Sequence, residues 1–176
     1  MAYDLDDFTA DLTRTLKERG TAGLDDLAIT LQPLLHNPAF IARTFTEETP
    51  FGKQVLFHDR ETGVYVQAHV QKPGKRGSPH SHGESWAIYG NVRGLTQMTI
   101  WRRVNPAEEQ HAVLERADEY TLGPGQARAY GPLVIHSTEH PEKAWVIRVT
   151  GCDLDTIARY RFRATTDRLI EPAAAQ

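Results

Sequence analysis

Three histidines carry the chemistry that this sequence could perform. His80 and His82 stand two residues apart in an extended stretch, and His136 ends the apolar run Leu133-Val134-Ile135. Side chains at i and i+2 of an extended strand point the same way, so a third imidazole from a distant strand can complete a set of three nitrogen ligands. Neutral imidazoles suit iron, nickel, copper and zinc. The spacing therefore predicts a metal site held by His80, His82 and His136.

The composition limits what else such a site could be. Cys152 is the only cysteine, which excludes an internal disulfide and a multi-thiolate zinc site. The chain has 20 basic and 23 acidic residues and a net charge of −3, with no long block of either sign, so we expect neither nucleic acid nor a membrane surface as partner. A small-molecule ligand fits better. No run of about 18 apolar residues occurs, and we expect a cytoplasmic protein.

The first 45 residues are predicted to be helical. Apolar residues recur at helical spacing from Leu5 to Leu16, with acidic residues in the first turn and basic ones before Gly20, which complements the helix dipole. A second helix follows from Leu24, is disturbed by Pro33 and ends at Asn37-Pro38; a short third piece covers 39–43. These helices are expected to pack on the domain that the remaining residues form.

From Gly52 onward the sequence predicts short strands. The segment 64–71 alternates apolar and polar residues, and Pro/Gly turns separate similar segments. We therefore expect one domain over residues 1–176, with a β-barrel at 46–165 and a tail at 166–176 that is frayed over 171–176. The polar set Tyr65, Gln67, His69 and Gln71 either faces water or lines a barrel lumen whose outer face the helices cover; alternation alone does not choose between these.

Several of these features together resemble the cupin superfamily. They are the segment Gly77-Ser78-Pro79-His80-Ser81-His82, the strand 86–94, the turn Gly123-Pro124-Gly125 and the strand-borne His136. Within that superfamily the chain is most similar to the cysteine and mercaptopropionate (thiol) dioxygenases, over roughly residues 51–162. The resemblance implies a mainly β fold, the cupin double-stranded β-helix with N-terminal α-helices. It also implies iron(II) held by the three histidines, with open positions for substrate and dioxygen.

The chain departs from that family in several places. The family's Ser-His-Tyr relay is missing, because Val146, Arg148 and Thr150 stand in its three places. Ala87 occupies the position of the cysteine that animal cysteine dioxygenases cross-link to the relay tyrosine. Many cupins also carry a glutamate ligand, but Glu84 follows His82 too closely for that pattern. We expect Glu84 to be an exposed or gating carboxylate.

Arginines are the candidates for holding a substrate. If the face that carries Arg148 looks into the barrel, its guanidinium needs an anion, which would be a substrate carboxylate or a protein carboxylate at the barrel mouth. Arg159 resembles the carboxylate-binding arginine of mercaptopropionate dioxygenases, with Arg161 beside it and an exposed basic strand as the rival interpretation. Lys53 falls near the corresponding arginine of cysteine dioxygenases. His140 is either a ligand-orienting group or proton carrier, or a loop histidine before a proline.

Together these features favour a mononuclear non-haem iron dioxygenase that acts with O2 on a small carboxylate-bearing substrate, a thiol among the options. One alternative is a metal-dependent isomerase, lyase or hydrolase that uses zinc, nickel or manganese as a Lewis acid. Another is a non-catalytic cupin that binds a small ligand, with a homodimer through a β edge open to it.

Overall fold

The helices of the N-terminal segment begin and end close to the predicted positions. The computed structural model describes residues 2–109, 111–164 and 169–173. Helix α1 (Leu5–Arg19) is capped by the Asp4 carboxylate, which accepts from the backbone N–H of Leu5 at 2.8 Å. A short 3-10 turn leads into α2 (Leu24–Leu35), which contains Pro33 without breaking, and α3 (Pro38–Thr44) begins at a proline. The predicted helical segment is confirmed.

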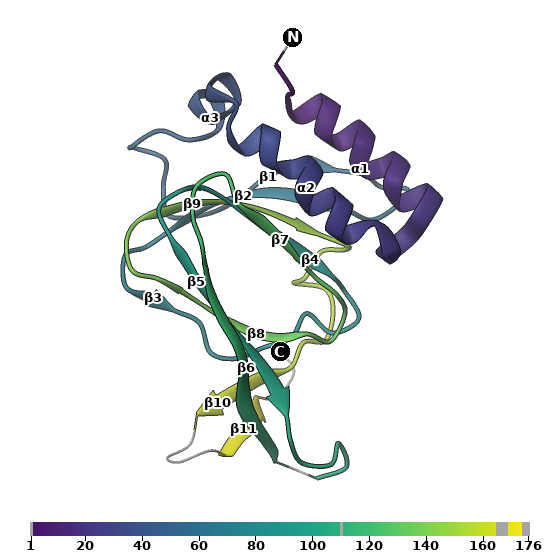
Figure 1. Cartoon of the computed structure of the whole chain (residues 1–176), viewed down its shortest axis with the longest axis vertical. Coiled ribbons are helices and arrows are strands. Elements are labelled where there is room, and N and C mark those ends of the chain that lie inside the picture. Colours follow the sequence, from purple (N-terminus) through teal and green to yellow (C-terminus); the bar gives the residue numbers. More distant parts are fainter. Residues whose placement is uncertain (1, 110, 165–168, 174–176) are drawn as a thin grey trace.

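The rest of the described chain forms two antiparallel sheets (Figure 1). The first has the order β1 (Gly52–His58), β2 (Tyr65–Gln71), β9 (Ala144–Thr150), β4 (Ala87–Arg93) and β7 (Ala127–Tyr130). The second has the order β10 (Arg161–Ala164), β11 (Leu169–Ala173), β6 (Ala112–Leu122), β5 (Thr96–Arg103), β8 (Ile135–His140) and β3 (Lys75–Arg76). The sheets face each other around a lumen, which confirms the predicted mainly β double-stranded β-helix with N-terminal helices.

Helices α1 and α2 cover the outer face of the first sheet (Figure 1). Alternate residues of its strands, such as Val66, Ile88 and Ile147, are buried against Leu31 and other apolar side chains of the helices. Gly90 allows close contact between α2 and β4, because a Cβ there would lie 2.8 to 2.9 Å from the nearest carbons of Leu35 and Leu31. The helices thus fix which face of each strand looks into the barrel.

The opposite face of these strands therefore looks inward. Gln67 and His69 are 3% and 8% exposed, although they belong to the polar set of β2. Of the two alternatives left open by alternation, the structure shows the barrel lumen for these two residues. Arg148 shares their environment, because it pairs with Gln67 on one side and with Tyr89 on the other.

The C-terminal segment differs from its prediction. Residues 169–173 form strand β11, which pairs with β10 and β6, whereas the sequence predicted a tail outside the barrel from residue 166, frayed from residue 171. Strand pairing of this kind depends on a distant partner, and a five-residue stretch containing Pro172 shows no local sign of it. The remaining tail residues lie outside the described part of the chain. Within that part, none of the helices has the length and hydropathy needed to cross a membrane.

Candidate metal centre

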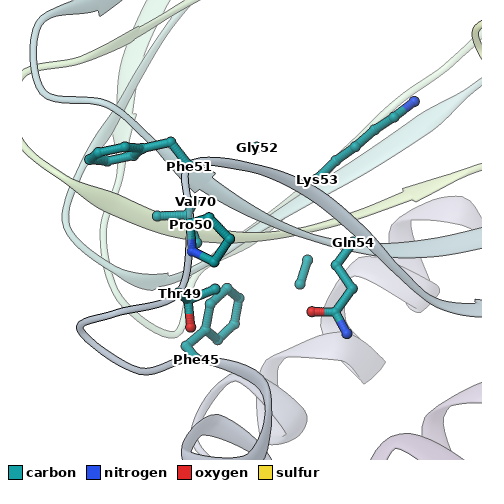
Figure 2. A pocket seen from close by; sticks show the side chains of 9 residues that line it. Phe45, Thr49, Pro50, Phe51, Gly52, Lys53, Gln54 and Val70 are labelled. Carbon is teal, nitrogen blue, oxygen red and sulfur yellow. The ribbon is translucent and has the colours of Figure 1, made fainter.

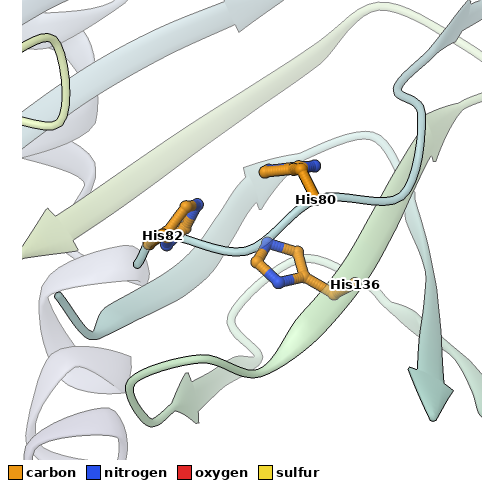
Figure 3. Close-up of side chains that lie close together, drawn as sticks. All are labelled: His80, His82 and His136. Atoms are coloured by element: carbon orange, nitrogen blue, oxygen red, sulfur yellow. The ribbon is translucent and has the colours of Figure 1, made fainter. Parts of the chain in front are cut away.

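His80, His82 and His136 meet inside the barrel (Figure 3). One ring nitrogen from each can be chosen so that all lie within 4.8 Å of one another. The ring centroids are 4.6 Å apart for His80 and His136, 4.8 Å for His82 and His136, and 5.4 Å for His80 and His82. No other group of His, Cys, Asp or Glu with this geometry occurs in the described residues.

The main chain sets the spacing of two of these histidines. His80 and His136 form an antiparallel bridge in which each backbone N–H donates to the other carbonyl at 2.9 Å. His136 lies on β8, but His80 belongs to no regular strand and forms only isolated bridges, to His136 and to Arg161, and His82 lies in the loop that follows. The expectation that the pair lies on a regular strand was therefore wrong. The turn at Gly83, with a φ of 57°, comes directly after His82.

The hydrogen bonds of the rings leave ligating atoms free. His80 Nδ1 lies 3.0 Å from the Ser78 carbonyl, and His136 Nδ1 lies 3.2 Å from the Val134 carbonyl. A carbonyl only accepts, so each Nδ1 carries the proton and each Nε2 keeps its lone pair. His136 Nε2 is buried and has no hydrogen-bond partner among the described residues. A buried unpaired acceptor costs free energy, and a metal ion would satisfy it, so the residues fit a metal.

Burial keeps these imidazoles neutral. It lowers the pKa of His82 to about 2 and that of His136 to about 3, and it also lowers the pKa of His80. The neighbouring imidazoles and Arg148 lower these pKa values further. Since a histidine binds a metal through its neutral form, the environment favours ligation at neutral pH.

Two tyrosines surround the cluster. The Tyr89 hydroxyl lies 3.3 Å from His82 Nε2, and the Tyr130 ring stacks on His136 with centroids 5.2 Å apart. Tyr130 also shares a short hydrogen bond with Tyr120 from β6. Tyr120 was not a candidate from the sequence, whereas Gln67 belonged to the polar set for which a barrel lumen was one of the two alternatives.

A cavity of about 390 Å³ opens beside the histidines and contains Arg148. Arg148 donates to the Gln67 side-chain oxygen at 2.9 Å, and its Nε is buried without a hydrogen-bond partner among the described residues. It forms no ion pair with a described carboxylate. The structure therefore gives no support to the protein salt bridge considered as one role for this side chain.

Arg159 and His140 line the same cavity. Arg159 lies 3.4 Å from Asp155, a longer separation than a strong charge-assisted hydrogen bond. His140 was expected to be a loop residue if it had no role, but it ends β8, is 3% exposed and approaches Thr96 Oγ1 at 3.2 Å. Burial lowers the pKa of His140 to about 4.

Other candidates lie away from this cavity. Lys53 lines a separate hollow of about 90 Å³ near Phe45 and Phe51 (Figure 2), and it pairs with Asp155. The Lys53 side chain points away from that hollow (Figure 2), and its partner Asp155 also pairs with Arg159. Glu84 is exposed and is not part of the histidine group, as expected. Trp86 lines a further hollow with Glu84 and Cys152, not the histidine cavity.

Replacing the buried lumen histidine His69 is expected to flatten the pH dependence of stability. Burial, with nearby cations, lowers the pKa of His69 from 6.5 to about 2 in the folded chain. The unfolded chain binds a proton at His69 below pH 6.5 and the folded chain does not, so the free energy of unfolding falls as the pH drops from 6.5 toward 2. This one site contributes about 1.4 kcal/mol per pH unit within that window.

In His69→Gln we therefore expect the free energy of unfolding to fall less steeply as the pH drops, by the contribution of one protonation site. Urea unfolding of both proteins across this pH range measures it, and His58→Gln, at an exposed histidine, is the matched control. Identical slopes for the wild type and His69→Gln would show that His69 is not held neutral.

Comparisons with known proteins give structural likeness only. No family model matches the chain, and no curated protein matches its sequence. Similar solved structures include cupin-superfamily proteins. KdgF from Halomonas sp. is 17% identical, with a TM-score of 0.44 over 60% of this chain and 82% of that one. A cupin-2 domain protein from Shewanella frigidimarina is 12% identical, with a TM-score of 0.45 over 64% and 90%. An oxalate oxidase in complex with the substrate analogue glycolate is 16% identical, with a TM-score of 0.43 over 64% and 57%.

Proposed function

We propose that this protein is a mononuclear non-haem iron dioxygenase that acts on a small carboxylate-bearing substrate. The observation that carries the proposal is the cluster of His80, His82 and His136 with a buried, unpartnered Nε2, placed beside a cavity that contains arginines. Iron(II) held by three neutral nitrogens would supply electrons for dioxygen and a positive charge for an anionic substrate. A thiol group on that substrate is compatible with the family that the sequence resembles.

The side chains of the cavity have separate roles in this proposal. Arg148 and Arg159 bind the carboxylate and so hold the reacting end of the substrate toward the histidines. Tyr89 keeps its hydroxyl at the edge of His82, where it can hydrogen-bond to a bound group. His140 lines the cavity as a neutral hydrogen-bonding group, because its lowered pKa leaves it uncharged near neutrality. Burial excludes bulk water from His82 and His136.

The same three imidazoles would also suit zinc, nickel or manganese used as a Lewis acid by an isomerase, lyase or hydrolase. Oxygen consumption separates the two functions. We expect iron(II)-reconstituted protein to take up oxygen in the presence of a small thiol or carboxylate, and zinc-reconstituted protein to take up none. Stoichiometric zinc or nickel in protein purified without chelator, with no uptake after iron loading, would favour the Lewis-acid enzyme. Ligand binding that survives the loss of all metal would indicate a binding protein.

A further inference from the structure

The cavity beside the histidines is strongly cationic. Its lining includes side chains from both sheets and from the segment that joins them, and none of the described residues that line it is an aspartate or glutamate. The cationic members are Lys75, Arg76, Arg148, Arg159 and Arg161. Like charges gathered in a confined, partly buried space repel one another, and the repulsion is relieved when anions enter.

Protein carboxylates offset only part of this charge. Arg76 pairs with Glu139 at 2.8 Å, and Arg159 reaches Asp155, a carboxylate that Lys53 also binds. Arg148 and Lys75 instead donate to neutral amide oxygens, at 2.9 Å and 2.7 Å.

None of the described carboxylates forms an ion pair with Arg148, Lys75 or Arg161. A single carboxylate in the cavity would therefore leave part of the cationic charge unbalanced.

The cations lie at two depths. Arg148 and Arg159 are partly buried, and they line the cavity together with His80 and Tyr89. Lys75 and Arg161 are exposed. The buried Nε of Arg148 has no hydrogen-bond partner in the described part of the chain, which marks an unfilled hydrogen-bonding position at the inner level.

We propose that the substrate of this site is a small molecule with two separated anionic groups, the inner one held by Arg148 and Arg159 and the outer one by Lys75 and Arg161. This inference rests on the proposed function, because it names the substrate class of the same cavity. Dicarboxylates and carboxylates that also carry a phosphonate or phosphate share the required chemistry. Guanidinium groups bind either kind of anion through paired N–H donors.

Calorimetric titration of the iron(II)-loaded protein without oxygen tests the proposal. The probes are malonate, succinate, glutarate, adipate and phosphonoacetate, with monocarboxylates of the same chain lengths for comparison. We expect the best dianion to bind at least about tenfold more tightly than its monocarboxylate, since one further charged hydrogen bond contributes roughly that factor. Tighter binding of phosphonoacetate than of the dicarboxylates would identify the phosphonate class. Equal affinity for dianions and monoanions, or no binding of either, would overturn the proposal.

Substitutions test which side chains bind the inner and the outer anionic group of the substrate. Arg161→Gln and Lys75→Gln are expected to reduce the preference for dianions to within about twofold while leaving monocarboxylate binding intact. Arg148→Gln is expected to weaken both classes. Arg102→Gln removes the same charge from an exposed arginine paired with Glu115 on the outer part of the second sheet, and it should change nothing. A preference that persists in both Arg161→Gln and Lys75→Gln would overturn the assignment of the outer group.

The outcomes separate this inference from the proposed function. Repeating the titration on metal-free protein shows whether the anion preference depends on the ion. A dianion preference without oxygen uptake would retain the inference and reject the dioxygenase. Oxygen uptake driven equally well by monocarboxylates would retain the dioxygenase and reject the inference.

Discussion

His136→Ala is expected to lower the affinity for a divalent metal by about a hundredfold or more. The expectation follows from geometry, because the ring lies within 4.6 to 4.8 Å, centroid to centroid, of both other imidazoles and its Nε2 has no other described partner. Loss of a group that only supports a ligand already costs about 10- to 100-fold in metal affinity, and loss of the ligand itself should cost more. Metal analysis after dialysis, and titration of the apo protein, measure the change.

The variant should still fold, since it removes an unpaired buried atom and leaves the backbone bridge to His80 in place. Circular dichroism checks this. His58→Ala removes an exposed histidine on β1 and should keep full metal content. Stoichiometric, tightly held metal in His136→Ala would contradict the assignment of the site.

Leu31→Ala is expected to destabilise the protein by about 2 to 5 kcal/mol. Leu31 is fully buried in the cluster that joins α2 to the outer face of the first sheet, and it packs where Gly90 allows the helix close to β4. Truncation there loses apolar burial and leaves a cavity between two rigid layers.

Urea unfolding gives the free energy of unfolding of each variant. Ile29→Ala on the same helix is the matched control, because Ile29 is 63% exposed and its truncation should change the stability by less than about 0.5 kcal/mol. Similar losses at both positions would mean that α2 does not pack on the sheet through Leu31.

The helical segment could be predicted well because its signals are local. Asp4 caps α1, the apolar repeat of α1 is regular, and Pro38 occupies the first turn of α3, where its missing N–H costs nothing. The strands were predictable as a class from alternation and turn residues. The hairpin of β10 and β11 was not, because its pairing depends on partners far away in the sequence.

The orientation of β2 shows the limit of a pattern taken alone. Gln67 and His69 alternate with apolar residues as they would on a solvent-facing strand, and only the helices packed on the other face show that they line the lumen. The packing of the helices on the outer face of the sheet likewise shows that the Arg148 side chain points into the lumen.

For the site, the three histidine positions could be named from the sequence and are brought together in the fold. The hydrogen bonds that hold these histidines in place could not be predicted from the sequence. The bridge between His80 and His136 and the Nδ1 contacts involve main-chain atoms. The ion pair between Lys53 and Asp155 likewise could not be predicted, because the two residues are far apart in the sequence.

The reciprocal main-chain hydrogen bonds between His80 and His136 mean that two of the three ligands are prealigned by the backbone. The entropy of bringing them together is lost when the chain folds, not when an ion arrives, so little reorganisation accompanies binding. Three neutral imidazoles, moreover, suit several divalent ions. Which ion occupies it would then follow intrinsic affinity and supply, and the metal content of the purified protein would vary with the growth medium.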